Sequence, residues 1–182
     1  MSQAGISRRI EAALVVIVPE AEPLVGPFRA KYDPAAGWGV PAHITINYPF
    51  IPGVRPTADV LSRLSKRFAE MSPFSFTLDH IARFPKVIYL TPKPVAAFVQ
   101  LIEQTVQEFP ESPLYEGRFD TITPHLTVAY SDDRDLLASV QREFSDAASG
   151  HLPLSAFADR VWLMDDSAGQ WEKRASFPLG SR

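Results

Sequence analysis

The chain has 182 residues, of which 46% are hydrophobic and 21% are charged, and its formal net charge is −3. This composition fits one globular domain over residues 1–182. It argues against a protein that coats long nucleic acid, because such proteins are usually basic, whereas a small anionic ligand held by a few groups is compatible with it. The sequence contains no cysteine, which excludes disulfides, thiolate metal sites and cysteine nucleophiles.

The first predicted element is a strand at 13–18, which is β-branched and continuous enough to be buried on both faces. The apolar run that contains this strand covers only seven residues, from Ala12 to Val18, between Glu11 and Pro19. A run of this length predicts neither a signal peptide nor a membrane span. We therefore expect a cytoplasmic protein.

The next part of the chain combines helices with one strand. Residues 20–34 predict a short helix that Pro27 starts or interrupts. A strand follows from His43. Residues 57–71 predict a second helix, because apolar residues recur there at helical spacing after Thr57, a residue type that caps helices.

The second half of the chain repeats this mixture. Residues 74–84 and 86–92 predict two strands that pair as a hairpin, and 95–109 predict an amphipathic helix. A strand at 125–130 and a helix at 133–148 follow. Helices and strands thus alternate irregularly along the chain.

The last predicted elements form a closing hairpin from 154–166 and 169–179. Mixed elements with an antiparallel tail predict an α+β fold. In each half, a strand that begins with a histidine after a proline is followed by a helix, at an offset of 82 residues from His43 to His125. We interpret the chain as one domain of two pseudo-symmetric antiparallel-sheet lobes, with helices outside and a central cleft.

Two short segments share a pattern. The sequence "PAHITINYPF" at 41–50 contains His43 and Thr45, and "PHLTVAY" at 124–130 contains His125 and Thr127. Each histidine follows a proline or lies within two residues of one. Each segment also alternates polar with apolar residues, as expected of a half-buried strand.

The alternation of a strand predicts that the histidine and threonine of each motif share one face. Asn47 is expected on the face of His43 and Thr45 if that strand continues. Tyr48 and Tyr130 are expected on the opposite face, with the apolar residues of the core. The two polar groups of one motif would then lie about two residue rises apart, roughly 6–7 Å.

Two histidines and two hydroxyls that meet in one cleft suit phosphoryl chemistry. Hydrolysis of a phosphodiester needs a base that takes a proton from the nucleophile and an acid that protonates the leaving oxygen. Histidine serves in either role near neutral pH. Threonine hydroxyls can donate hydrogen bonds to the non-bridging phosphate oxygens, so this arrangement requires no metal ion.

The paired motif "HITI" at 43–46 and "HLTV" at 125–128 resembles the signature of the 2H phosphoesterase superfamily. Within it, the chain resembles the 2′-5′ RNA ligase family, which includes RNA 2′,3′-cyclic phosphodiesterases. The first strand, both motifs and the "RFPKVIYLTP" segment come in the family's order over nearly the whole chain. The resemblance implies a bilobal α+β fold with a central cleft.

The resemblance also implies the function. His43 and His125 would be the catalytic residues, with His43 as general acid and His125 as general base, although the symmetry of the motifs leaves these roles exchangeable. Thr45 and Thr127 would bind the substrate. The expected substrates are RNA ends or cyclic nucleotides with a 2′,3′-cyclic phosphate, and RNA ligation would be the reverse reaction. We expect a monomer that needs no cofactor, metal ion, membrane or obligate protein partner.

The sequence departs from the family in one respect. Characterised members often carry a basic residue shortly after the motif, whereas this chain has Tyr48 and Tyr130. A phosphate clamp would then come from Arg83, Lys86 or Arg118. Base stacking is a further candidate role for the aromatic residues Trp38 and Phe84, which lie in loops beside the presumed cleft.

Other interpretations remain at this point. One histidine in a strand is more often structural than catalytic. Only the matched pair of motifs favours the catalytic interpretation. His80 and His151 lack the motif and receive no role. The main alternative is a module on the same fold that binds nucleotides or RNA ends with little catalysis. A structural or regulatory protein is a third hypothesis, but neither alternative needs two proton-transfer groups.

Overall fold

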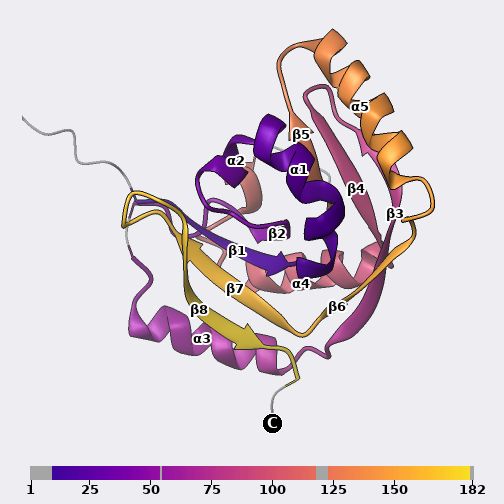
Figure 1. Ribbon diagram of the computed structural model, residues 1–182. Coiled ribbons are helices and arrows are strands. Elements are labelled where there is room, and N and C mark those ends of the chain that lie inside the picture. Colours follow the sequence, from indigo (N-terminus) through magenta and orange to yellow (C-terminus); the bar gives the residue numbers. More distant parts are fainter. Residues whose placement is uncertain (1–9, 54, 118–122, 181–182) are drawn as a thin grey trace, which may run out of the picture.

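The structure is a computed structural model that describes residues 10–53, 55–117 and 123–180. It contains strands, α-helices and two short 3₁₀ helices in a mixed order (Figure 1). In chain order they are β1 (Ala12–Ile17), η1 (Pro19–Ala21), α1 (Glu22–Tyr32), α2 (Pro34–Gly37), β2 (His43–Asn47), α3 (Ala58–Ala69), β3 (Phe74–Arg83), β4 (Val87–Lys93), α4 (Val95–Glu108), η2 (Leu114–Gly117), β5 (Leu126–Tyr130), α5 (Arg134–Ala148), β6 (Leu154–Ala158), β7 (Arg160–Asp165) and β8 (Glu172–Pro178).

The strands form one curled antiparallel sheet in the order β6-β3-β4-β5-β2-β1-β7-β8 (Figure 1). The two histidine strands, β2 and β5, are neighbours at its centre, where Ile44 pairs with Leu126. The α+β class and the antiparallel pairing are confirmed. The prediction of two lobes, each with its own sheet, is replaced by one continuous sheet.

The helices form much as their sequences predict. Thr57 caps α3, since its side chain accepts a hydrogen bond from the backbone N–H of Val60. Helix α1 begins at Glu22 and contains Pro27 in its interior, so Pro27 does not start it. Pro27 lacks the N–H donor of one helical hydrogen bond, and the helix continues past it to Tyr32.

The predicted closing hairpin is confirmed where β7 pairs with β8, but the single strand at 154–166 is wrong, because this segment forms two strands with different partners. Strand β6 pairs with β3, whereas β7 pairs with β1 and β8. The chain changes partner at Asp159, whose carbonyl accepts a hydrogen bond from the backbone N–H of Leu179. A change of partner leaves no mark in hydrophobic periodicity, so the sequence did not reveal it.

Strand β1 is buried on both faces, as predicted. Leu14 and Val16 belong to the main core with residues of the helices, while Ala13 and Val15 belong to a smaller cluster on the other face. Helix α1 packs against β5, α4 against β2 and α3 against β8. The smaller cluster lies beside the first histidine motif, where it forms part of a pocket.

Candidate active site

Each histidine strand contains a β-bulge three residues after its histidine. In β2, Leu14 pairs with Asn47 and Val15 with Thr45, which leaves Ile46 as the extra residue. In β5, Ile88 pairs with Ala129 and Tyr89 with Thr127, which leaves Val128 as the extra residue. A bulge of this kind places two consecutive residues against one residue of the partner strand. The two motifs therefore match in backbone geometry as well as in sequence.

The bulge corrects the predicted faces of β2. Asn47 is buried, and its side-chain amide donates a hydrogen bond to the carbonyl of Ser112 at 2.8 Å. Tyr48 is shifted to the face of His43 and Thr45, where it lines the same pocket. The alternation thus holds up to Ile46 and reverses after it. In β5, Tyr130 is likewise exposed and lies outside the core.

The same hydrogen bond orients both histidine rings. The Nδ1 atom of His43 lies 2.8 Å from the carbonyl oxygen of Pro41, and the Nδ1 atom of His125 lies 2.8 Å from the carbonyl oxygen of Thr123. A carbonyl oxygen only accepts, so Nδ1 carries the proton in both rings. In the neutral form of each ring, Nε2 then has a free lone pair.

The pairing of β2 with β5 brings the four predicted site residues together. Since the strands are antiparallel and Ile44 lies opposite Leu126, extending the register by one residue places His43 opposite Thr127 and Thr45 opposite His125. The two histidines are then diagonal neighbours. Side chains in this relation have Cα atoms about 7–8 Å apart.

Burial depresses the pKa values of both rings. The pKa of His43 falls from 6.5 to about 4, chiefly because the ring is removed from water, while the bond to the Pro41 carbonyl raises it in part. The positive charge of His125 lowers the pKa of His43 as well, so the two rings are close enough to interact. Burial also lowers the pKa of His125, against the opposing effect of the Thr123 carbonyl. Both histidines are therefore mostly neutral at pH 7 in the ligand-free protein.

A buried ion pair supports the segment that leads to His43. Arg29 of α1 is buried, and its Nε donates to Asp33 at 2.9 Å while a second nitrogen donates to the Val40 carbonyl at 3.0 Å. The Glu22 carboxylate accepts a hydrogen bond from the backbone N–H of Ala42 at 2.5 Å. These bonds hold the backbone on both sides of Pro41, whose carbonyl orients His43. The charge of Arg29 also lowers the pKa of His43.

Tyr115 reaches the first motif from the η2 turn. Its side chain forms a hydrogen bond with Thr45, and its backbone N–H donates to the carbonyl of Tyr48 at 2.7 Å. Its φ angle of 50° is in the left-handed region, which is unfavourable for a residue with a large side chain. Contacts with both the side chain and the backbone hold Tyr115 in this conformation, beside the Thr45 hydroxyl.

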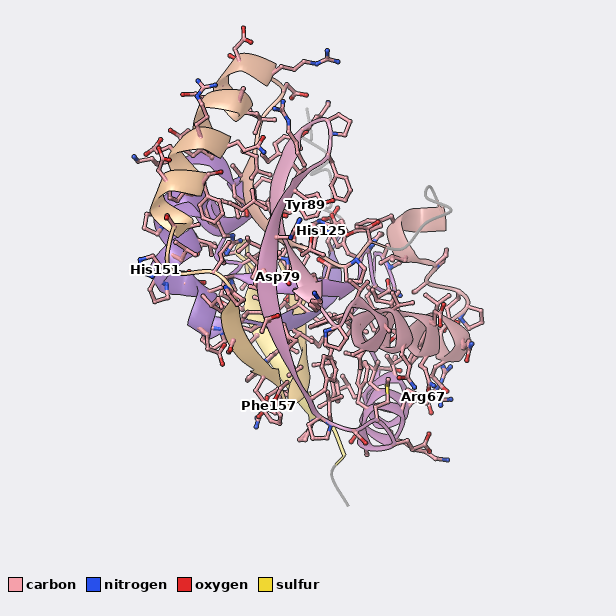
Figure 2. All side chains as sticks on the ribbon, turned by 90° about the vertical axis from the view of Figure 1, so that its right-hand side faces the viewer. Arg67, Asp79, Tyr89, His125, His151 and Phe157 are labelled. Atoms are coloured by element: carbon pink, nitrogen blue, oxygen red, sulfur yellow. The ribbon has the colours of Figure 1, made fainter. Side chains whose placement is uncertain are left out.

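Two aromatic rings enclose His125. Phe84 stacks on Tyr89, with ring centroids 4.3 Å apart. Both rings contact His125 edge-on, and their centroids lie 5.2 Å (Phe84) and 5.3 Å (Tyr89) from the centroid of the imidazole ring. Figure 2 shows Tyr89 and His125 side by side near the middle of the curled sheet. These rings cover part of His125, which is half-buried. A base-stacking role for Phe84 stays a prediction, since the ring faces Tyr89.

A pocket of about 220 Å³ adjoins His43 and Thr45. Strands β1 and β7 form its floor, and Trp38, Tyr48 and Trp171 line it. Trp38 is 59% exposed, which leaves its ring available to a ligand at the pocket edge. Base stacking by Trp38 stays a prediction.

The predicted phosphate clamps make other contacts. Arg83 donates to the carbonyl of Arg134, and Lys86 pairs with Asp132 on the surface. Arg118 lies outside the described residues. His151 lies apart from His125 in Figure 2, and no role is indicated for it.

Two kinds of feature are absent from the part of the chain that the structure describes. Within residues 10–53, 55–117 and 123–180, no three or more His, Cys, Asp or Glu side chains are grouped so that they could hold a metal ion. No helix in these same ranges is both long enough and apolar enough to cross a membrane.

A model of the 2′-5′ RNA ligase superfamily matches residues 17–170, which include both histidine motifs and the strands between them. The chain belongs to the 2′-5′ RNA ligase superfamily. This membership of the 2H phosphoesterases confirms the resemblance that the paired motifs predict.

One curated relative in this superfamily is the protein named "Putative phosphoesterase OB1230" of Oceanobacillus iheyensis. It is 26% identical over 166 residues, which cover 84% of this chain and 87% of the relative. Together with the superfamily, it indicates a phosphoesterase.

Solved structures share the fold. E. coli LigT complexed with 3′-AMP has a TM-score of 0.61 at 17% identity and covers 95% of this chain and 99% of its own. The protein TT0787 of Thermus thermophilus has a TM-score of 0.58 at 19% identity and covers 96% of this chain and 99% of its own. At these identities the likeness establishes a LigT-like fold alone.

The sequence did not reveal several neighbours of the motifs. Arg29 is one charged residue in an ordinary helical pattern, and Tyr89 is one aromatic residue in a strand. Tyr115 and Trp171 lie far from both motifs along the chain. Tertiary packing and strand pairing bring these residues to the site, and neither leaves a local signal in the sequence.

Proposed function

We propose that this protein is a metal-independent phosphodiesterase that opens 2′,3′-cyclic phosphate ends of RNA or nucleotides by acid–base catalysis with His43 and His125. The observation that carries the proposal is the shared orientation of the two rings. Each Nδ1–H is bound to a carbonyl two residues upstream, so each Nε2 is the atom available to a substrate. One phosphate between diagonal strand neighbours lies within reach of both.

The proposed step balances with water as the only co-reactant. The neutral histidine takes a proton from water at Nε2, and the water oxygen forms a bond to phosphorus. The bond from phosphorus to one ribose oxygen breaks, and the protonated histidine gives its Nε2 proton to that oxygen. The product is a phosphate monoester on the other ribose oxygen.

Thr45 and Thr127 are proposed to bind the non-bridging phosphate oxygens. Their hydroxyls lie on the face of the two rings, and hydroxyl donors stabilise the negative charge that concentrates on these oxygens in the transition state. Tyr115 forms a hydrogen bond with the Thr45 side chain. We assign it the role of positioning Thr45.

The pKa values bear on the division of roles. The resemblance assigns the acid to His43 and the base to His125. In the ligand-free protein the pKa of His43 is about 4, so His43 is the ring that stays neutral when one proton is shared between the two. This order favours His43 as the base and His125 as the acid, the reverse of the family assignment.

A leaving-group experiment separates the two assignments. A phosphodiester with a p-nitrophenolate leaving group needs little help from a general acid. The variant that lacks the acid should therefore regain most of its rate on this substrate, whereas the variant that lacks the base should not. If His43 is the base, recovery is expected for His125→Ala alone.

The function itself is tested with purified protein, EDTA, and a 2′,3′-cyclic nucleotide or an RNA that ends in a cyclic phosphate. Phosphorus NMR should record conversion to one monoester and identify the bond that breaks. A protein that binds the cyclic phosphate but leaves it unchanged would be a binding module. The nucleotide complexes of LigT, with 3′-AMP and with ATP, support nucleotides as the substrates to try first.

A further inference from the structure

The pocket beside His43 has a distinct recognition chemistry. Its floor is formed by residues of the sheet, and aromatic rings also line it. The floor residues are Ala13, Val15 and Met164, and the rings are Trp38, Tyr48 and Trp171. At about 220 Å³, the pocket suits a group smaller than a drug-sized ligand.

Glu11 supplies the formal charge in this pocket. Among the described residues that line it, the other titratable group with a charge near neutral pH would be His43, and its pKa of about 4 keeps that ring neutral. The Glu11 carboxylate accepts a hydrogen bond from the Tyr48 hydroxyl at 2.6 Å. Its backbone N–H donates to Asp166 at 2.9 Å, and its carbonyl accepts from the backbone N–H of Asp166 at 3.1 Å.

These contacts fix Glu11 while leaving it able to bind a ligand. A carboxylate has about four acceptor sites, and the Tyr48 hydroxyl occupies one of them. The remaining acceptor sites are on the Glu11 carboxylate, and Glu11 lines the pocket. Glu11 therefore favours a ligand whose edge carries N–H donors, and it disfavours a ligand whose edge carries acceptors.

The spacing between Glu11 and the histidine motif suits a nucleoside phosphate. Val15 lies opposite Thr45, and Glu11, the residue before β1, precedes Val15 by four residues. Four residue rises of a strand span about 13 Å. A phosphate held at His43 and Thr45 would therefore direct its base along β1, over the apolar floor, toward Glu11.

We propose that this pocket binds a guanine base and that Glu11 makes the enzyme selective for guanine beside the cyclic phosphate. Guanine presents two adjacent donors, N1–H and the N2 amino group, which match the two oxygens of one carboxylate. Adenine presents an acceptor at N1, and uracil presents one donor between two acceptors. The proposal rests on the proposed function, because it assumes a phosphate held at the two motifs.

The shape of the pocket separates a base from an organic cation. Aromatic rings with a carboxylate also suit a quaternary ammonium group, but such cations are bound by ring faces that surround them. Here the floor is made of Ala13, Val15 and Met164, so aromatic ring faces do not surround a ligand on that side. The ring centroids of Tyr48 and Trp171 lie 6.1 Å apart, and the two ring planes are tilted by 56°. The two rings therefore form one wall of the pocket.

Equilibrium binding tests the pocket without relying on turnover. Calorimetry would compare guanosine, inosine and adenosine 3′-monophosphates, since inosine lacks only the N2 amino group of guanosine. We expect guanosine to bind more tightly than inosine, and inosine more tightly than adenosine. Loss of one hydrogen bond to the charged group, as in inosine, should weaken binding by about 10-fold to 100-fold, and loss of both, as in adenosine, by about 10²-fold to 10⁴-fold.

Glu11→Gln is the diagnostic variant, because glutamine keeps the size of the side chain and can still accept from Tyr48. We expect it to remove the preference for guanosine, while Glu20→Gln, a change at an exposed carboxylate of η1, should leave the preference intact. Equal binding of adenosine and guanosine 3′-monophosphates, an unchanged preference in Glu11→Gln, or tighter binding of phosphocholine would each overturn the proposal.

Turnover distinguishes this proposal from the proposed function. If the four 2′,3′-cyclic nucleotides are hydrolysed at equal kcat/KM, the guanine pocket is refuted while the phosphodiesterase stands. If none is hydrolysed but guanosine 3′-monophosphate binds selectively, the phosphodiesterase is refuted while the guanine pocket stands. The expected result is hydrolysis of all four, with guanosine preferred by kcat/KM and the preference lost in Glu11→Gln.

Discussion

Ile44 of β2 lies opposite Leu126 of β5, and this pair joins the two halves of the sheet. Both side chains are fully buried in the main core. Their neighbours along each strand point to the opposite face, where they place the two histidines and two threonines together. A core contact thus fixes the relative position of the four polar residues.

The pH dependence of kcat/KM should be a bell with its maximum below pH 6.5. The reaction needs one neutral and one protonated ring. Below about pH 4, His43 becomes protonated and the base is lost, whereas above the lowered pKa of His125 the acid is lost. Initial rates from pH 3.5 to 9 at low substrate would measure this profile.

The parameter kcat should respond differently to pH. A bound anionic phosphate favours the protonated rings, so the bell for kcat should move to higher pH than the bell for kcat/KM. A kcat/KM profile that is flat, or that rises above pH 7, would contradict the roles given to the two rings.

Replacement of either histidine by alanine should lower kcat by about 10²-fold to 10⁴-fold, the usual contribution of a positioned acid or base. The double variant should be little worse than the single ones, since groups that act as a unit are not additive. His151→Ala is the matched control, because His151 is exposed in a loop and should be dispensable. A single variant with near-normal turnover would refute acid–base catalysis by this pair.

Thr45→Ala and Thr127→Ala should each reduce kcat/KM by less than the histidine variants do. Each removes one hydrogen bond to a charged oxygen, which contributes about 1.5–3 kcal/mol. The proton transfers stay in place, so the pH bell should keep its shape. Thr77→Ala, a change on β3 away from both motifs, serves as the control for the loss of a strand threonine.

Arg29→Met should destabilise the fold and also change His43. The variant leaves Asp33 buried without its partner, which is expected to cost about 3–5 kcal/mol in the free energy of unfolding. Loss of the positive charge should raise the pKa of His43. Urea denaturation would measure the first effect, and NMR titration of the ring would measure the second.

Two variants isolate the role of Arg29. Arg142→Met, a change at an exposed position of α5, should alter neither the free energy of unfolding nor the pKa of His43. Arg29→Met combined with Asp33→Leu removes both charges and should recover much of the stability, because no buried charge then lacks a partner. If Arg29→Met leaves the pKa of His43 unchanged, the ion pair does not influence the site.

The sequence predicted the strands, the main helices and the two motifs because each depends on local patterns. His43 and Thr45 share a face, as the alternation predicts, but the same pattern gave the wrong face for Asn47 and Tyr48. The bulge at Ile46 is set by pairing with β1, and an extra apolar residue in a strand looks like any other. Long-range pairing likewise decides where 154–166 divides, and the packing of α1 decides why Arg29 approaches the segment before His43.

The most direct test of the central claim is hydrolysis of 2′,3′-cyclic GMP by the purified protein in EDTA, followed by phosphorus NMR, with His125→Ala measured in parallel. We expect conversion to one guanosine monophosphate by the wild-type protein, and a rate about 10²-fold to 10⁴-fold lower for the variant. No conversion by the wild-type protein, activity that appears only when a divalent metal is added, or equal rates for the two proteins would contradict it.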